Sequence, residues 1–156
     1  MSTKKRPFVR VAAVVHHGGR LLLNRTPMAC GAVFSLLGGH LEVGESAPHC
    51  LVREFKEELS WPLDVGELLF IGENLWREGD PEDPHFGETL HEICLYLRAT
   101  VPAPFCDTDP KSQEEHLWPG WFAPEEVQQG ELVPPFLAPL LEGKTITPPT
   151  LLSRGF

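Results

Sequence analysis

The sequence predicts a mixed α/β fold in which helices pack against a mixed β-sheet. Short apolar runs bounded by glycine come first, one strongly periodic helical segment follows, and further apolar runs come after it. Strands on both sides of a single central helix are typical of a sheet covered by helices. The chain has 156 residues, of which 42% are hydrophobic, so it is long enough for one domain with a core of its own.

Before the helical segment, three runs have the composition of strands. Residues 8–16 and 21–25 are separated by a Gly-Gly pair, which favours a β-hairpin, and residues 33–37 end at a second Gly-Gly pair. After the helix we expect strands at 68–71 and 90–101, short helices at 124–129 and 136–141, and loops in the Pro- and Asp-rich segments 79–88 and 102–113.

The central segment, residues 46–60, changes to helical periodicity. Leu51, Phe55 and Leu59 recur every four residues and form one apolar stripe. Ser46 is suited to cap the helix N-terminus, because its hydroxyl oxygen can accept a hydrogen bond from a free backbone N–H of the first turn. The sequence therefore predicts an amphipathic helix that lies against the sheet.

The charge balance excludes several kinds of partner. The formal net charge is −9, and such a surface repels both duplex nucleic acid and anionic membranes. No stretch approaches the ~18 consecutive apolar residues of a membrane span. The basic start is not followed by the long apolar segment of a secretion signal, so we expect a cytoplasmic protein. The four cysteines form no Cys-x-x-Cys pair, and we expect free thiols.

The predicted helix carries an acidic face. Glu54, Glu57 and Glu58 share one arc of about 100°, beside the apolar stripe. Like charges three and four residues apart destabilise a helix, and a hard divalent cation would offset their repulsion. Oxygen ligands of this kind select Mg²⁺ or Mn²⁺, and Arg53 could hold Glu57 by a charge-assisted hydrogen bond. The alternative is an ordinary solvated helix face.

The segment Gly39–Trp61 resembles the Nudix box, G-x5-E-x7-R-E-U-x-E-E-x-G-U, in which U is apolar. Glu45 and the acidic residues of the helix stand at the required spacings. One position departs, because Ser60 replaces the late glycine that ends the helix in left-handed geometry, and we expect local strain there. The resemblance extends to a core of about residues 8–142 within a single domain, 1–156.

This resemblance implies an α/β/α sandwich and a metal-dependent pyrophosphohydrolase. Members cleave the diphosphate bridge of a nucleoside diphosphate that is linked to another moiety, with Mg²⁺ or Mn²⁺ as cofactor. The implied metal site consists of the Gly38 carbonyl, Glu57 and Glu58, with Glu54 as a further ligand or as the base. Arg53 and Glu45 would orient these groups.

An additional acid outside the box is expected by the same resemblance. Glu115 lies six residues before Trp121, at the start of a Trp-led strand, and is our candidate for the base or an extra ligand. Glu92 is its rival, with a structural role as the alternative.

Three further residues are candidates for substrate binding. Arg25 follows the second strand and could hold a phosphate, unless it is only a solvated arginine. Trp76 could stack on a nucleobase, and Arg77 follows it in the region where subfamilies carry substrate signatures. His16 and His17, beside a turn, are expected to point at solvent.

Two other functions compete with hydrolysis. A non-catalytic nucleotide-binding regulatory module of the same fold is the first, although such modules typically lose box carboxylates and this chain retains them. A prenyl diphosphate isomerase is the second, and it would need a cysteine such as Cys30 or Cys94 in the pocket.

The partner that the sequence favours is a small nucleotide-type diphosphate, of a class that the sequence does not specify. Apolar residues at 136–141 and Leu151-Leu152 could form a homodimer contact, and a monomer is equally compatible. The tail, residues 148–156, is expected to be partly disordered.

Overall fold

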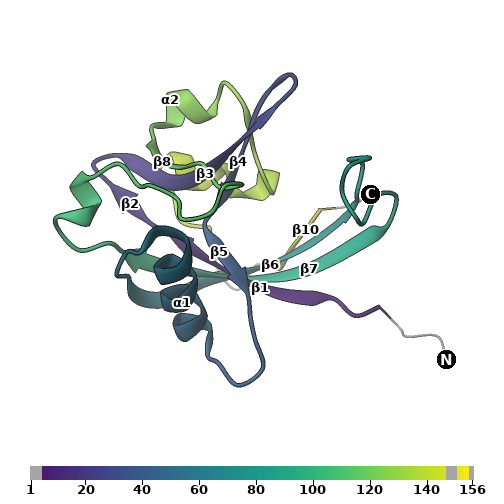
Figure 1. Cartoon of the computed structure of the whole chain (residues 1–156), viewed down its shortest axis with the longest axis horizontal. Coiled ribbons are helices and arrows are strands. Elements are labelled where there is room, and N and C mark those ends of the chain that lie inside the picture. Colours follow the sequence, from purple (N-terminus) through teal and green to yellow (C-terminus); the bar gives the residue numbers. More distant parts are fainter. Residues whose placement is uncertain (1–4, 147–150, 155–156) are drawn as a thin grey trace.

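The computed structural model describes residues 5–146 and 151–154. Sheet A contains five strands in the order β10-β6-β7-β1-β5, and sheet B contains β2-β3-β4-β9 with β8 paired to β3. Both sheets mix parallel and antiparallel pairs, and sheet A lies between helix α1 and sheet B (Figure 1). The predicted mixed α/β class is confirmed, with two sheets in place of one.

The strands are β1 (Phe8–Val14), β2 (His16–His17), β3 (Arg20–Met28), β4 (Gly31–Leu36), β5 (Gly38–His40), β6 (Asp64–Arg77), β7 (Thr89–Thr100), β8 (Pro119–Phe122), β9 (Glu131–Leu132) and β10 (Leu151–Arg154). The helices are α1 (Ala47–Leu59), α2 (Pro124–Val127) and α3 (Ala138–Leu141), with single 3₁₀ turns η1 (Phe105–Asp107) and η2 (Pro135–Leu137). Among the described residues, no helix has the length and apolar character needed to cross a membrane.

Strand β1 lies between β7 and β5 in sheet A, and its second half, Val11–Val14, is buried on both faces. Val11 and Ala13 pack in the core beneath α1, whereas Ala12 and Val14 pack in the core beneath sheet B. Alternate side chains of a strand point to opposite faces, so a strand that is covered on both sides needs apolar residues at every position. This requirement explains why Val11–Val14, which follow Arg10 in β1, are all apolar.

The prediction that residues 8–16 and 21–25 pair as a hairpin is wrong for most of these residues. β1 pairs with β5 and β7 in sheet A, and only His16 and His17 pair with β3 in sheet B. The physical reason is the burial of β1 on two faces, which suits the middle of a sheet and not one arm of a half-exposed hairpin.

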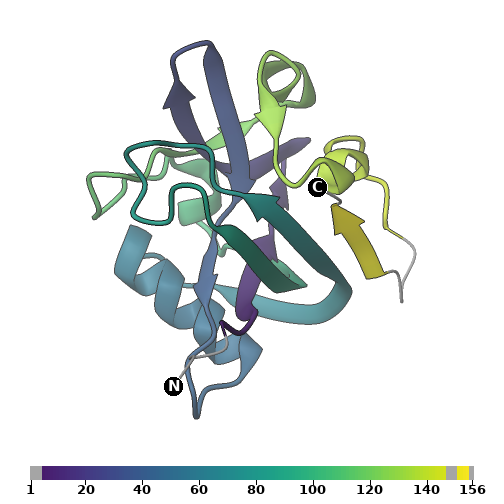
Figure 2. The ribbon, with the colours of Figure 1, turned by 90° about the vertical axis from the view of Figure 1, so that its right-hand side faces the viewer.

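Helix α1 forms as predicted. The Ser46 hydroxyl accepts a hydrogen bond from the His49 backbone N–H at 3.4 Å, and Leu51, Phe55 and Leu59 are buried against sheet A. The helix ends at Ser60, whose φ of 55° and ψ of 32° place it in the left-handed region. α1 lies at the opposite end of the molecule from the turn between β3 and β4 (Figures 1 and 2).

Two of the apolar residues at 136–141 are part of the protein's own core. Leu137 of η2 and Leu140 of α3 are buried in the core beneath sheet B, so these side chains are not available to a second subunit. Within the predicted flexible tail, β10 pairs in parallel with β6. Residues 148–150 and 155–156 of that tail lie outside the described residues. The four cysteines are unpaired, as expected.

We expect Ser60→Gly to stabilise the protein, because a Cβ in the left-handed region costs energy that glycine avoids. The expected gain is about 0.5–1 kcal/mol, which for a chain of this size raises the melting temperature by roughly 1–4 °C. Thermal unfolding measures it, with Ser60→Ala as the matched control that keeps the Cβ. Equal melting temperatures for the glycine and alanine variants would contradict a strained helix end.

Candidate functional site

The site begins where β5 meets α1. Both glycines of β5 approach their neighbours so closely that a side chain would not fit. A Cβ on Gly39 would lie 2.0 Å from Oε1 of Glu54, and a Cβ on Gly38 would lie 2.0 Å from the carbonyl oxygen of Val11. Gly39 therefore places bare backbone against a carboxylate of the acidic helix face, and Gly38 allows β5 to approach the backbone of β1.

Arg53 connects the loop before α1 to the acidic face. Its guanidinium donates to Oε1 and Oε2 of Glu45 at 2.8 and 3.1 Å. It also donates to Glu54 at 2.8 Å and to Glu57 at 3.3 Å. The predicted pairing of Arg53 with Glu57 is confirmed, although the contacts with Glu45 and Glu54 are shorter. One arginine thus orients three carboxylates at once.

The charge on Glu45 follows from these contacts. Hydrogen bonds from Arg53 and from the Glu42 backbone lower the pKa of Glu45 to about 2, so it stays ionised. The same hydrogen bonds raise the pKa of Arg53 above its usual value. Glu45 therefore holds the Arg53 guanidinium by hydrogen bonds, and Arg53 in turn contacts the acidic face. This arrangement agrees with an orienting role for Glu45.

Glu58 is the carboxylate of the acidic face to which Arg53 donates no hydrogen bond. Its side chain is buried, with 8% exposure, and its Oε2 atom has no hydrogen-bond partner. Burial, together with the nearby charges of Glu54 and Glu114, raises the pKa of Glu58 to about 7. An unpaired buried carboxylate oxygen is costly, and it indicates a group whose partner is a bound ligand.

A hard divalent cation fits this donor set. The groups that converge here are carboxylate oxygens, with the backbone of Gly39 beside the carboxylate of Glu54, and no sulfur or imidazole is required. Such oxygen donors match Mg²⁺ and Mn²⁺. A cation would supply the positive charge that Glu58 lacks, and Glu57, which is half-exposed, leaves the site open to solvent.

The loop that precedes β8 reaches the same site. The Gln113 backbone N–H donates to the Glu58 carbonyl oxygen at 2.7 Å, and the charge of Glu114 acts on Glu58. Glu115, the predicted extra acid, is exposed. Of these two acids, Glu114 is therefore the one whose charge raises the pKa of Glu58. The role of Glu115 stays a prediction.

Arg10 was not recognised from the sequence, although a charged residue inside an apolar strand is a signal. It donates to the Leu36 carbonyl oxygen at 2.7 Å, and its charge lowers the pKa of both Glu58 and Glu92. Burial outweighs this effect in Glu92 and leaves its pKa raised. Asn74, which pairs across the sheet with Glu92, carries a second buried oxygen without a partner.

The three predicted substrate-binding residues make their hydrogen bonds and contacts away from the three carboxylates of the acidic face. Trp76 donates to Glu78 at 3.3 Å and Arg77 to the Gly87 carbonyl oxygen at 3.2 Å, so both are engaged within their own hairpin. Arg25 is exposed on sheet B, beside a hollow that Phe122 also lines. In the described part of the chain, none of these three contacts Glu54, Glu57 or Glu58.

We expect Glu58→Gln to raise the melting temperature of the metal-free protein and to reduce its stabilisation by Mg²⁺. Glutamine keeps the size of the side chain but removes the buried charge, for an expected gain of about 1–3 kcal/mol. Thermal unfolding in EDTA and then in Mg²⁺ measures both effects. Glu82→Gln, at an exposed loop position, is the control for net charge. If Mg²⁺ stabilised wild type and Glu58→Gln equally, the cation would bind elsewhere.

Comparison with known proteins agrees with this geometry. A family model described as the NUDIX domain matches residues 5–142. Over 63 residues, 40% of this chain, the sequence is 38% identical to "NAD-capped RNA hydrolase NudC" of Pseudomonas fluorescens. The matched segment is 22% of that relative's length, so the chain spans under a quarter of the curated relative.

Solved structures show the same fold over most of the chain. The solution structure of the E. coli ORF135 protein is 27% identical, with a TM-score of 0.54, and the match covers 88% of this chain and 87% of that one. A NUDIX hydrolase from Nitrosomonas europaea is 18% identical, with a TM-score of 0.66, and the match covers 96% and 81%. The second likeness concerns the fold alone. The family match over residues 5–142 includes the acidic helix and both sheets, and the chain therefore belongs to the Nudix hydrolase family.

Proposed function

We propose that the chain is a Mg²⁺- or Mn²⁺-dependent pyrophosphohydrolase that cleaves the diphosphate bridge of a nucleoside diphosphate linked to another moiety. The observation that carries the proposal is the acidic face of α1, where Glu58 is buried with an unpartnered oxygen beside Glu54. A diphosphate is itself an anion, and only with a cation present could this face accept it.

Each acidic residue has a distinct place in the proposed reaction. Glu57 and Glu58, with the Gly38 carbonyl, would hold the cation, which would neutralise the charge on the diphosphate and on the attacking water. Glu54 is a further ligand or the base that accepts the proton of that water. Arg53 keeps Glu54 and Glu57 oriented through the hydrogen bonds it donates to both.

The base has two further candidates on the loop before β8. Glu115 remains a proposal from the sequence. The electrostatic contact of Glu114 with Glu58 favours Glu114 as the alternative, because a base must lie within reach of the water at the metal site. Glu114 is also paired with His116 at 3.1 Å, and this contact would have to loosen when Glu114 accepts a proton.

We propose that residues of β1, β6 and β7 contact the parts of the substrate beyond the diphosphate. Arg10, Asn74 and Glu92 offer polar groups there, and Trp76 offers an aromatic ring 6.1 Å from the ring of Phe8. Arg77 and Arg25 remain candidates for phosphate contacts at the edge of the substrate. The name of the Pseudomonas fluorescens relative refers to NAD-capped RNA, so NAD is included among the substrates to test.

The competing functions have less support. A non-catalytic module needs no buried, uncompensated carboxylate, whereas this chain retains the full acidic set of the box. For a prenyl diphosphate isomerase, the named thiols are poorly placed. Cys30 lies between β3 and β4, at the end of the molecule opposite α1, and Cys94 is fully buried between the sheets.

A hydrolysis screen with products separated by chromatography tests the proposal, because cleavage of most diphosphate bridges gives two phosphomonoesters and no free phosphate. It covers nucleoside triphosphates, nucleotide sugars, ADP-ribose, NAD, dinucleoside polyphosphates and coenzyme A, each with Mg²⁺ and with Mn²⁺. We expect turnover of at least one of these classes, with kcat reduced by about 10²-fold or more in Glu57→Gln, because a metal ligand is lost. Glu82→Gln removes the same charge outside the site and should retain wild-type kcat.

Two outcomes would contradict the proposal. Turnover that persists in Glu57→Gln would show that Glu57 is not a metal ligand. Silence across the panel, with Mg²⁺ still raising the melting temperature, would favour the regulatory module.

A further inference from the structure

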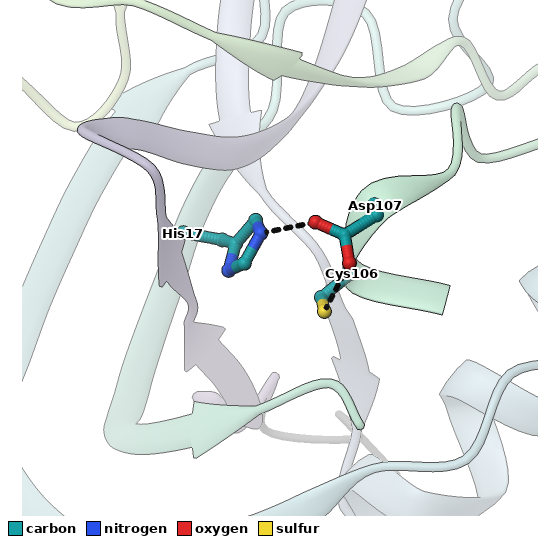
Figure 3. Close-up of side chains that lie close together, drawn as sticks. All are labelled: His17, Cys106 and Asp107. Carbon is teal, nitrogen blue, oxygen red and sulfur yellow. Dashed lines mark hydrogen bonds and ion pairs between the residues drawn. The ribbon is translucent and has the colours of Figure 1, made fainter. Parts of the chain in front are cut away.

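We propose that His17, Cys106 and Asp107 form a second metal site, which takes Zn²⁺ or a similar borderline ion and is separate from the carboxylates of α1. His17 comes from β2, and Cys106 and Asp107 come from η1, 89 and 90 positions later in the chain. Figure 3 shows the three side chains turned toward one another.

The spacing of the donor atoms suits tetrahedral coordination. One donor atom from each residue lies within 4.8 Å of the other two. Nε2 of His17 is 2.9 Å from Oδ1 of Asp107, and Sγ of Cys106 is 3.7 Å from Oδ2 of Asp107. Ligands placed about 2.0–2.3 Å from a tetrahedral Zn²⁺ are themselves about 3.3–3.6 Å apart. A small adjustment of side-chain torsions would therefore seat the ion.

The donor types distinguish this cluster from the acidic face of α1. Imidazole nitrogen, thiolate sulfur and carboxylate oxygen are the ligands of Zn²⁺, whereas Mg²⁺ requires oxygen. Three protein ligands leave a fourth position, and the exposure of His17 and Asp107 leaves that position open to water. The chain would thus sort two metals by ligand chemistry, with the hard ion at Glu58 and the softer ion at Cys106.

Neighbouring contacts hold the cluster in place without a metal. Nε1 of Trp121 on β8 donates to the Thr108 carbonyl oxygen at 3.1 Å, which fixes the end of η1. The ring of Trp121 lies 5.7 Å from the ring of His17, and the ring of Phe105 lies 5.9 Å from that of Trp61. The ligands are therefore presented by anchored elements, so that binding need not order a free loop.

Simpler interpretations leave Cys106 unexplained. An exposed ion pair between His17 and Asp107 contributes little to stability and needs no third group. A metal ion makes use of all three groups, because it replaces the thiol proton and bridges imidazole to carboxylate.

A metal bound at this cluster would connect β2 to the segment that follows η1. The segment that follows η1 leads to Gln113, whose backbone N–H donates to the backbone carbonyl oxygen of Glu58 in α1. We therefore expect Zn²⁺ to raise the melting temperature beyond the shift that saturating Mg²⁺ produces.

Cobalt provides a spectroscopic test in the intact protein. With saturating Mg²⁺ on the carboxylates, Co²⁺ should bind with one equivalent per chain and show the near-ultraviolet charge-transfer band of a thiolate ligand, and Zn²⁺ should displace it. Cys106→Ser should lose the band, whereas Cys30→Ser, which removes an exposed thiol elsewhere, should keep it. His17→Gln should weaken affinity by more than the ~10–100-fold that follows loss of a merely orienting group.

Folding is checked independently of the cluster. Cys106→Ser should retain the Mg²⁺-induced rise in melting temperature, which depends on α1. Absence of the thiolate band in wild type, or a band of equal strength in Cys106→Ser, would overturn the proposal. Because no turnover is measured, neither outcome depends on the proposed pyrophosphohydrolase activity.

Discussion

Glu54, Glu57 and Glu58 carry like charges on one side of α1, and the position of Glu58 makes that repulsion the constraint on which the site depends. The adjoining side of α1 packs in the core through Leu51, Phe55 and Leu59, so the helix cannot rotate to expose Glu58. Arg53 compensates Glu54 and Glu57 but makes no hydrogen bond to Glu58. The charge of Arg10 offsets part of the buried charge of Glu58, and a bound cation would offset the rest.

The local parts of this arrangement could be predicted from sequence. The helix, the Ser46 cap and the acidic arc follow from short-range spacing, and the left-handed Ser60 follows from the motif glycine that it replaces; the structure confirms the helix and both of its caps. Long-range pairing could not be predicted in the same way. The placement of β1 between β5 and β7 depends on segments far away in the chain, and the apolar run alone was equally consistent with a hairpin.

Side chains that reach the site from other elements were also beyond sequence reasoning. The charge of Arg10 lowers the pKa of Glu58 and Glu92 because β1 lies beside β7. The path of the loop before β8 brings the charge of Glu114, rather than that of Glu115, close enough to raise the pKa of Glu58. The same holds for His17, which was expected to point at solvent and instead contacts Asp107 at 2.9 Å. Spacing along the chain contains no information about such contacts.

The central claim is that one divalent cation binds among the carboxylates of α1. The most direct measurement is an anomalous-difference map from crystals of the protein grown with Mn²⁺. We predict a peak within coordination distance of Glu57, Glu58 and the Gly38 carbonyl oxygen, with Glu54 beside it. Well-diffracting crystals with no peak there, or with Mn²⁺ bound only at another place, would contradict the account.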